Sequence, residues 1–355
     1  MNNFTDEKRI LSPSEIKVKY PLLLKSIQNV ETTRHEIQNI LDSRDQRFLM
    51  IIGPCSFHDS HAAMEYATKL KRLSEEVSDT ILIVMRVYIE KPRTGAGWKG
   101  YINDPYINNT YKVQEGIINA RKFMLHLSEM SLPIAMEILN PCAYLYFDDL
   151  LSWCTIGART VESQPHREIA SNLTIPLGFK NSTSGNIDVA INGIEFAFRK
   201  QTFIGLNAHG EICVIYAKGN PYSHLVLRGG QEGPNYFKEN IMNIEKKMSS
   251  SNIPMNIIVD CSHGNSSKNY TLQEKVFNDV MSQKLAGNIS ILGVIIESFL
   301  EEGNQAVTNI PKLKYGCSIT DACIGWEVTE RIIKEGYKKL SSIKKTRRKF
   351  LVSMQ

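Results

Sequence analysis

The segment Phe48–Cys55, with the sequence FLMIIGPC, is a continuous apolar run that ends in glycine, proline and cysteine. Seven similar runs follow it along the chain, and amphipathic segments separate most of them. These runs span Ile81–Tyr88, Ile134–Leu139, Cys154–Arg159, Ile175–Lys180, His224–Arg228, Asn256–Cys261 and Ile289–Ser298. Strands that are apolar throughout are typical of parallel sheets that are covered on both faces. The sequence therefore predicts eight parallel strands.

The segments between these runs carry apolar residues at the spacing of an amphipathic helix. Clear examples are His61–Glu76, Val113–Met130, Ser163–Leu173, Ile187–Phe198, Tyr236–Met248 and Leu272–Leu285. Eight strands, each followed by a helix, predict an α/β fold of the (β/α)8 or TIM-barrel type. A doubly wound open sheet is the alternative, and the absence of a Gly-x-Gly-x-x-Gly turn after the first strand disfavours it.

One insertion and two extensions depart from this alternation. Short strand patterns at residues 202–206 and 211–216 flank a turn sequence, so residues 202–216 predict a β-hairpin inserted before the sixth strand. The chain divides into an N-terminal extension at residues 1–47, a catalytic barrel at residues 48–337 and a basic C-terminal tail at residues 338–355. Within the extension, helices are predicted from Pro13 to Tyr20 and from Val30 to Leu41.

The charge of the chain is concentrated in its tail. The formal net charge is +5, but the tail alone holds the bases Lys338, Lys339, Lys344, Lys345, Arg347, Arg348 and Lys349 and no acid. The rest of the chain therefore carries a slight excess of acid. A nucleic-acid-binding barrel that uses this tail is an alternative function, but a solvated extension is the simpler interpretation.

The cysteines and the N-terminus indicate a cytoplasmic protein without a membrane span. There are 7 cysteines, and no two have the Cys-x-x-Cys spacing. An odd number of cysteines in a chain of this length is typical of a reducing compartment. The N-terminus lacks the apolar segment of a signal peptide, and no uncharged apolar run is long enough to cross a bilayer.

Cations gather where the predicted strands end. They are Arg86, Lys91, Arg93, Arg159, Lys180 and Arg228. In TIM barrels this end of the strands carries the active site, and cations that are buried together need anionic partners. A phosphate carries a charge of about −1.5 to −2 at neutral pH. The sequence therefore predicts a site for two phosphorylated small molecules, one of which also carries a carboxylate.

A second group of residues lies at the ends of the first, seventh and eighth strands. Cys55, His263 and Glu297 become neighbours when the barrel closes, and Asp321 adds a further donor from the loop after the eighth strand. Such mixed ligands suit one divalent metal ion, namely Mn, Fe, Co or Zn. One rival hypothesis makes Cys55 a nucleophile with His263 as its base, and another makes Lys180 or Lys91 a Schiff-base amine.

These residues lie in motifs that resemble type I 3-deoxy-D-arabino-heptulosonate-7-phosphate (DAHP) synthases. Seven motifs appear in the order of that family, and the resemblance covers residues 5–335. They are Ile52-Gly53-Pro54-Cys55-Ser56, Lys91-Pro92-Arg93-Thr94, Ile156-Gly157-Ala158-Arg159-Thr160, Gly178-Phe179-Lys180-Asn181, Leu227-Arg228-Gly229-Gly230, Asp260-Cys261-Ser262-His263 and Ser318-Ile319-Thr320-Asp321.

The resemblance implies an aldol-type condensation of phosphoenolpyruvate with erythrose 4-phosphate, the first step of the shikimate pathway to the aromatic amino acids. It implies a metal at Cys55, His263, Glu297 and Asp321, and phosphoenolpyruvate at Arg86, Lys91, Arg159, Lys180 and Arg228. Arg93 and Thr94 would meet the aldose phosphate. Lys91 is the candidate general acid, whereas Glu137 either orients water or Lys91, or pairs with Arg159 or Lys180.

The resemblance also implies feedback inhibition by an aromatic amino acid in a homo-oligomer, either a dimer or a tetramer, with the N-terminal extension as part of the effector site. Residues 5–10 and 219–224 look closest to the tryptophan-sensitive type. The implied effector pocket involves Tyr144, Leu145, Leu173, Thr174 and Phe203. Around it the chain departs from the family pattern at Asn140, Tyr144, Ser182 and Ser184, so sensitivity to phenylalanine, to tyrosine or to no effector is the alternative.

Overall fold

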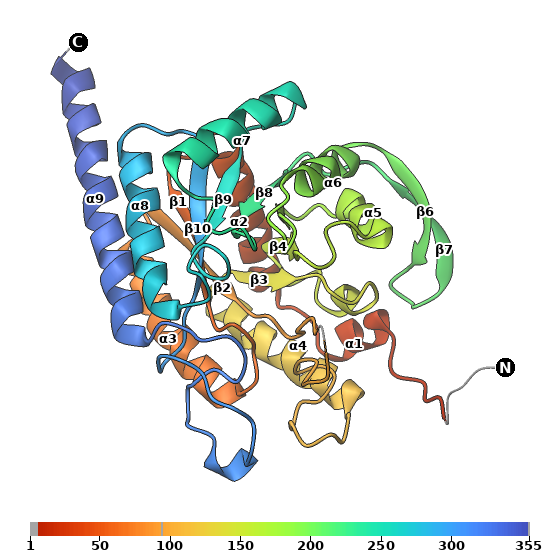
Figure 1. Cartoon of the computed structure of the whole chain (residues 1–355). Helices are drawn as coiled ribbons and strands as arrows, with labels where there is room; N and C mark the ends of the chain where they lie inside the picture. The colour runs from red at the N-terminus through yellow and green to blue at the C-terminus, as the bar shows by residue number, and fades with distance from the viewer. Residues whose placement is uncertain (1–5, 94, 354–355) are drawn as a thin grey trace.

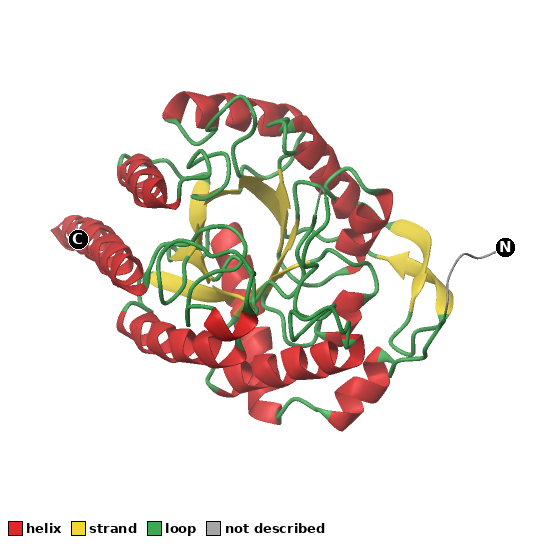
Figure 2. Cartoon of the chain, turned by 60° about the horizontal axis from the view of Figure 1, so that its bottom comes forward, coloured by secondary structure: helices red, strands yellow, loops and turns green. Residues whose placement is uncertain are grey.

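The computed structural model describes residues 6–93 and 95–353 and forms a closed barrel of parallel strands (Figure 1, Figure 2). The order around the barrel is β1, β10, β9, β8, β5, β4, β3 and β2. The bounds are β1 Phe48–Gly53, β2 Ile81–Arg86, β3 Ile134–Glu137, β4 Trp153–Ile156, β5 Leu177–Lys180, β8 Ser223–Leu227, β9 Ile257–Asp260 and β10 Ile291–Glu297. The predicted TIM barrel is confirmed.

Helices cover the outside of the barrel, and Figure 2 looks into the ring of strands that they surround. They are α3 Ser60–Glu76, α4 Val113–Glu129, α5 Gln164–Asn172, α6 Asp188–Phe198, α7 Lys238–Ser250, α8 Gln273–Leu285 and α9 Trp326–Ser353. All but α9 coincide with the predicted segments to within a few residues. The helical spacing of apolar residues was therefore a sufficient signal for them.

One connection lacks the helix predicted to follow every strand, and one helix runs further than the sequence predicted. Between β3 and β4 the chain forms only the short 3-10 helix η1, Ala143–Tyr146, because the Asn140 side chain accepts a hydrogen bond from the Cys142 N–H and starts a turn. After β10, α9 continues through residue 338, where the sequence predicted a solvated tail. Ile332 and Ile333 of α9 are fully buried, which anchors the first part of this helix to the barrel.

Side-chain alternation along the strands separates the core into an inner and an outer layer. In β2, Leu82 and Val84 belong to the cluster inside the barrel, whereas Ile83 and Met85 pack in the cluster between strands and helices. Because consecutive side chains of a strand point to opposite faces, the next inward-facing residue of β2 is Arg86. The apolar layers thus end where the polar mouth of the barrel begins.

The second helix of the N-terminal extension closes the other end of the barrel. This helix, α2 Leu24–Leu41, begins earlier than predicted, and its residues Ile37, Ile40 and Leu41 are buried in the inner cluster. They pack with inner side chains such as Leu49 and Trp153. The interior is therefore a filled core with one open end, as is usual for TIM barrels.

A glycine makes room for the largest inner side chain. A Cβ on Gly178 would lie 2.7 Å from the Trp153 ring and 2.5 Å from Val226, closer than real contacts allow. The Trp153 indole N–H donates to His224 Nε2 over 3.0 Å, and both residues are fully buried. Burial of the imidazole lowers the pKa of His224 to about 4, so this ring stays neutral and keeps its role as acceptor.

The predicted hairpin is present as a separate two-stranded antiparallel sheet before β8. It consists of β6 Gln201–Leu206 and β7 Ile212–Ala217, with Ile204 opposite Val214. The first helix of the extension, α1 Pro13–Lys19, begins at a capping box formed by Ser12 and Glu15. Its Ser14 N–H donates to the carbonyl of Ala208 at the tip of the hairpin over 2.8 Å. Helix α1 of the extension is therefore attached to the tip of the hairpin.

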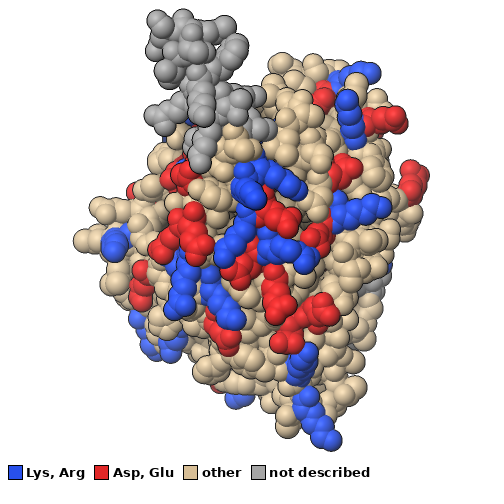
Figure 3. Space-filling model, turned by 90° about the vertical axis from the view of Figure 1, so that its left-hand side faces the viewer, with Lys and Arg blue, Asp and Glu red and all other residues tan. Residues whose placement is uncertain are grey.

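The face over α8 and α9 carries acidic and basic side chains side by side (Figure 3). Arg331 of α9 pairs with Glu274 of α8 over 2.7 Å, and Lys334 lies 3.9 Å from Glu76 of α3. The basic side chains from residue 344 onward lie outside the part whose side chains are described. Among the described residues, no helix combines the length and the apolar content needed to cross a bilayer.

Candidate active site

The last inward-facing position of most barrel strands carries a charged side chain. The last residues of five strands are Arg86 of β2, Glu137 of β3, Lys180 of β5, Asp260 of β9 and Glu297 of β10, and Arg228 lies just beyond β8. Parallel strands all end on the same side of a barrel, so these side chains meet at its mouth. The alternation that fills the interior with apolar residues therefore also gathers the charges.

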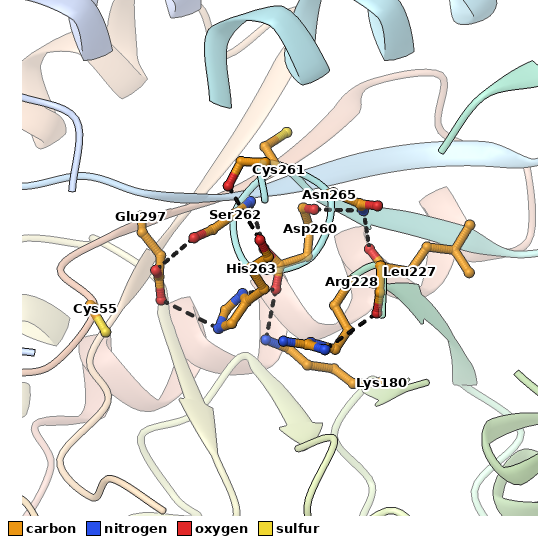
Figure 4. A network of polar contacts seen from close by, with 12 residues as sticks. Cys55, Lys180, Leu227, Arg228, Asp260, Cys261, Ser262, His263, Asn265 and Glu297 are labelled. Atoms are coloured by element: carbon orange, nitrogen blue, oxygen red, sulfur yellow. Dashed lines mark hydrogen bonds and ion pairs between the residues drawn. The ribbon is translucent and has the colours of Figure 1, made fainter. Parts of the chain in front are cut away.

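Three of the four predicted metal ligands converge in this mouth. Donor atoms of Cys55, Glu297 and Asp321 all lie within 4.8 Å of one another. Glu297 is fully buried at the end of β10, and its two oxygens accept from Arg86 over 3.0 Å and from Ser262 over 2.8 Å. These bonds fix the orientation of the carboxylate toward Cys55, which lies beside it in Figure 4.

His263 lies at the edge of this cluster rather than inside it. Its Nε2 is 3.9 Å from Glu297 Oε1, and its Nδ1 is 2.9 Å from Asp260 Oδ2 without the alignment of a hydrogen bond (Figure 4). The backbone of His263 has a φ of 57°, which is uncommon for a residue other than glycine. Both ring nitrogens thus face carboxylates, so His263 is not placed as a base for Cys55.

The donor set fits a divalent cation of the first transition series. Burial, together with the charge of Glu297, raises the pKa of the Cys55 thiol to about 11, so the sulfur is protonated unless a cation binds it. Burial opposes the ionisation of Glu297, but His263, Arg86 and Lys91 lower its pKa to about 2. One soft sulfur, one imidazole and two carboxylates are a ligand set for Mn, Fe, Co or Zn.

The loop after β10 brings Asp321 to Cys55. Ser298 and Ile324 form an isolated parallel bridge, and the Ser56 and Thr320 hydroxyls share a hydrogen bond of 2.7 Å. Cys323 packs under the loop, where its sulfur accepts from the Cys55 N–H over 3.4 Å. These contacts hold Asp321, which the sequence predicted as a donor from the loop after the eighth strand, beside Cys55.

Lys91 extends from the loop after β2 to the cluster of Cys55, Glu297 and Asp321. Its Nζ lies 3.1 Å from both the sulfur and the carbonyl oxygen of Cys55. Burial works against its charge, yet Cys55 and Glu297 raise the pKa of Lys91 above its usual value. A Schiff-base lysine must be neutral to attack, so this environment favours Lys91 as a proton donor instead.

Two of the predicted cations are neutralised by buried acids. Arg86 pairs with Glu297 over 3.0 Å, and Lys180 pairs with Asp260 over 2.8 Å, all with side chains at most 5% exposed. Burial opposes the ionisation of Asp260, but His263 and Lys180 lower its pKa well below the usual range. The Lys180 Nζ is thus directed at a buried carboxylate rather than at the cavity alone, an arrangement that is also unfavourable for Schiff-base chemistry.

A cavity of about 310 Å³ opens above these pairs. Its wall includes most of the predicted site residues, namely Lys91, Arg93, Glu137, Arg159, Lys180, Arg228, His263 and Asp321, whereas Arg86 and Cys55 are not among the residues that line it. Burial lowers the pKa of Arg228, and the nearby charge of Arg159 lowers it further. Two guanidinium groups that repel each other at the wall of a cavity are suited to binding a phosphate between them.

The wall of the cavity also contains residues that the sequence did not identify. Thr183, Lys268 and Asn304 line the wall, and Lys268 adds a further cation from the loop after β9. No regular pattern in the sequence marks this loop position. Thr94 lies outside the described residues, so its predicted role remains a prediction.

Glu137 faces the cavity because a glycine leaves it space. A Cβ on Gly157 would lie only 2.1 Å from Glu137 Oε1. Lys180 forms its ion pair with Asp260, and no ion pair joins Glu137 to Arg159 within the described part of the chain. This arrangement favours the first of the two predicted roles, in which Glu137 orients water or Lys91.

A second cavity, of about 210 Å³, lies on the outside of the barrel beside η1. It is lined by Tyr144, Leu145, Leu173 and Thr174 of the predicted effector residues, together with Arg34, Asp148, Asp149, Asn172 and Ile175. Phe203 of the hairpin is not among the residues that line it. The Tyr144 side chain is buried at 7% exposure and forms part of the wall. Arg34 of α2 is a further member that the sequence did not identify.

A buried acid connects the substrate loop to the loop that leads to this second cavity. Glu90 is 8% exposed, and its carboxylate accepts from the Asn140 N–H over 3.2 Å. Burial raises the pKa of Glu90 to about 7, and the charge of Glu137 adds to this, whereas hydrogen bonds from Asn140 and Asn103 oppose it. Glu90 thus lies in an environment that disfavours its charge.

Comparison with known proteins agrees with this geometry. Residues 25–334 match the DAHP synthetase I family. The chain is 45% identical over 345 residues to the phospho-2-dehydro-3-deoxyheptonate aldolase, Tyr-sensitive, of Escherichia coli (strain K12), covering 96% of each chain. It is 42% identical over 339 residues to the Trp-sensitive enzyme of the same strain, covering 94% of this chain and 97% of the relative. These similar identities do not show which aromatic amino acid regulates this chain.

A solved structure supports the same assignment. The chain matches the structure of phospho-2-dehydro-3-deoxyheptonate aldolase from Francisella tularensis SCHU S4 with a TM-score of 0.93 and 41% identity. The match covers 96% of this chain and 99% of that structure. The similarity therefore extends over the barrel and its additions.

The raised pKa of Glu90 predicts a pH-dependent cost of folding. A carboxyl whose pKa rises from 4.5 in the unfolded chain to about 7 binds more protons when folded, so stability falls as the pH rises through this window. Glu90→Gln removes the ionisation and should gain about 3 kcal/mol relative to wild type between pH 4.5 and pH 8. Urea unfolding at several pH values measures the difference. The exposed Glu335→Gln is the control, and a pH-independent difference for Glu90→Gln would contradict the assignment.

Proposed function

The chain belongs to the DAHP synthetase I family, and we propose that it is a metal-dependent DAHP synthase with the active site described above. It condenses phosphoenolpyruvate with D-erythrose 4-phosphate and water to give DAHP and phosphate, the first step of aromatic amino acid biosynthesis. The single observation that carries the proposal is the cation-lined cavity directly above the cluster of Cys55, Glu297 and Asp321.

The cations of the mouth bind the substrates by charge. Arg159 and Arg228 at the outer wall, with Lys180, take the phosphate of phosphoenolpyruvate, while Arg86 and Lys91 take its carboxylate. Charge-assisted hydrogen bonds of this kind contribute roughly 1.5–3 kcal/mol each. Arg93, which is exposed on the β2 loop and donates to the Trp98 carbonyl over 2.8 Å, takes the phosphate of the aldose.

A divalent metal would complete the site. Cys55, Glu297 and Asp321, with His263 at their edge, would hold the ion, and the ion would supply Lewis acidity toward the aldehyde oxygen of erythrose 4-phosphate. Carbon 3 of phosphoenolpyruvate forms the new bond to the aldehyde carbon. Lys91 gives its proton to the aldehyde oxygen, which becomes a hydroxyl. Glu137 orients the water that adds to carbon 2, and phosphate leaves with cleavage of its C–O bond.

We further propose that tryptophan is the effector and that it binds in the cavity beside η1. The support is the resemblance of residues 5–10 and 219–224 to the tryptophan-sensitive type, together with the cavity of about 210 Å³. Its wall offers Leu145 and Leu173 for an indole, and Arg34 for a carboxylate. Inhibition requires only that tryptophan binds one conformation of the substrate loop more tightly than the other.

The assembly we propose is a homo-oligomer that uses the outer face of the hairpin. Ile204, Ile212, Val214 and Tyr216 are between 53% and 79% exposed on this face, whereas Phe203 and Ile215 between them are half-buried. An exposed apolar surface without charges is typical of an interface. A second copy supplies the same apolar surface, and two identical faces can pack about a two-fold axis.

The activity is tested by phosphate release from phosphoenolpyruvate with erythrose 4-phosphate. Turnover should need both substrates, be abolished by a chelator and return with Mn. Lys91→Ala should lower kcat roughly 10²–10⁴-fold, because it removes a general acid. Lys339→Ala is the matched control, since Lys339 Nζ donates to Asn278 on the helical surface over 3.1 Å. Full turnover after verified metal removal would refute the mechanism. Equal kcat and KM values for the Lys91→Ala and Lys339→Ala variants would also refute it.

Tryptophan should inhibit the wild type, whereas phenylalanine and tyrosine should not. Tyr144→Gly removes a ring from the cavity wall, so we expect tryptophan to inhibit this variant at concentrations about tenfold lower, within the usual range of coupling. Initial rates with each amino acid measure this. Inhibition of the wild type by phenylalanine or tyrosine alone would assign another subtype, and inhibition of Tyr144→Gly alone would mean that Tyr144 fills the pocket.

The hairpin interface predicts a change in mass. The double variant Ile204→Glu, Val214→Glu places two charges in the apolar face and should dissociate the oligomer, because buried unpaired charges are costly. Light scattering coupled to size-exclusion chromatography gives the mass. Ile289→Glu is the control, since Ile289 is 79% exposed away from the hairpin. A double variant with the mass of the wild type would exclude this interface.

A further inference from the structure

An aromatic ring lies against the deepest cation of the mouth. Tyr88 follows Arg86 by two residues, and its neighbours Val87 and Ile89 belong to the outer core cluster, so Tyr88 continues the inward-facing series of β2. The Arg86 Cζ lies 4.0 Å from the centroid of the Tyr88 ring, which is a cation–π contact. The two residues are only 1% and 2% exposed.

The hydrogen bonds of Arg86 leave part of its guanidinium unused. Nη2 donates to Glu297 over 3.0 Å, and Nε donates to the carbonyl of Pro54 over 3.4 Å. Nη1 is buried and has no hydrogen-bond partner among the described residues, and the same holds for the hydroxyl of Tyr88. Buried donors without partners are rare in folded proteins and mark places that a ligand or water completes.

The ring stabilises the guanidinium in a way that no acid would. A second carboxylate would accept from Nη1 and use the last free donor of the guanidinium, so no donor would be left for a ligand. The face of an aromatic ring attracts a cation without accepting from its in-plane N–H groups. It also blocks one side of the guanidinium, which restricts rotation toward a two-bond contact with Glu297.

We propose that Tyr88 is a positioning residue whose ring holds the Arg86 guanidinium so that Nη1 stays free for the carboxylate of phosphoenolpyruvate. This inference rests on the proposed function for the identity of the anion. The ring carries the role, because the hydroxyl has no partner in the site. Tyr88 thereby separates the two tasks of Arg86, which are to orient Glu297 and to bind substrate.

The test compares Tyr88→Leu with Tyr88→Phe. Leucine removes the ring, and we expect the KM for phosphoenolpyruvate to rise about 10- to 30-fold, which corresponds to the loss of a desolvated cation–π contact. The KM for erythrose 4-phosphate should change by less than about twofold, since Arg93 binds it from another loop. Phenylalanine keeps the ring and should restore the KM for phosphoenolpyruvate. If leucine prevents folding, Tyr88→Met replaces it.

The control for a lost buried tyrosine is Tyr236→Leu. Tyr236 is 3% exposed and packs on Phe237 with ring centroids 4.4 Å apart, so its loss should lower stability without raising the KM for phosphoenolpyruvate. An unchanged KM in Tyr88→Leu, or an equal rise in Tyr88→Phe, would overturn the inference.

A crystal structure of the substrate-free variant separates this inference from the proposed function. In Tyr88→Leu we expect the guanidinium to turn so that Nη1 also contacts Glu297. A guanidinium that keeps its position would overturn the positioning role whatever the enzyme's activity. If the wild type does not turn over phosphoenolpyruvate, the proposed function is refuted. The comparison of the two crystal structures still tests whether Tyr88 positions Arg86.

Discussion

Side chains of a strand alternate between two faces, and in this barrel that constraint decides where the chemistry lies. Leu82 and Val84 fill the interior with apolar groups. They lie on the same face of the strand as Arg86 at its end. A shift of one residue in register would turn the charge outward and the outer apolar residues inward. The packing of the core and the composition of the mouth are therefore set together.

Burial of so many charges is tolerated because acids and bases are matched in pairs. Arg86 with Glu297 and Lys180 with Asp260 are almost completely excluded from water, where an unpaired charge would cost several kcal/mol. The pairing does not exhaust the cations, since Arg228 and Arg159 remain at the cavity and repel each other. The buried ion pairs thus hold the side chains of the mouth in place. The two arginines at the cavity remain available to attract anions.

The inner and outer cavities are joined by a short series of contacts. Glu90, next to Lys91, accepts from the Asn140 N–H, and the Asn140 side chain accepts from the Cys142 N–H where η1 begins. η1 then carries Tyr144 into the wall of the outer cavity. The connection between β3 and β4 therefore contacts both regions.

The sequence by itself determined the strands, most of the helices and the residues that bear charge, because periodicity and motifs are local properties. It also placed Cys55, Glu297 and Asp321 together, since strand order in a closed barrel makes the first and last strands neighbours. It did not determine α9 beyond residue 326, Arg34, Lys268 or the stacking of Tyr88 on Arg86. Those features arise from contacts between distant segments, whose distances and unpaired donors exist only once the chain has folded.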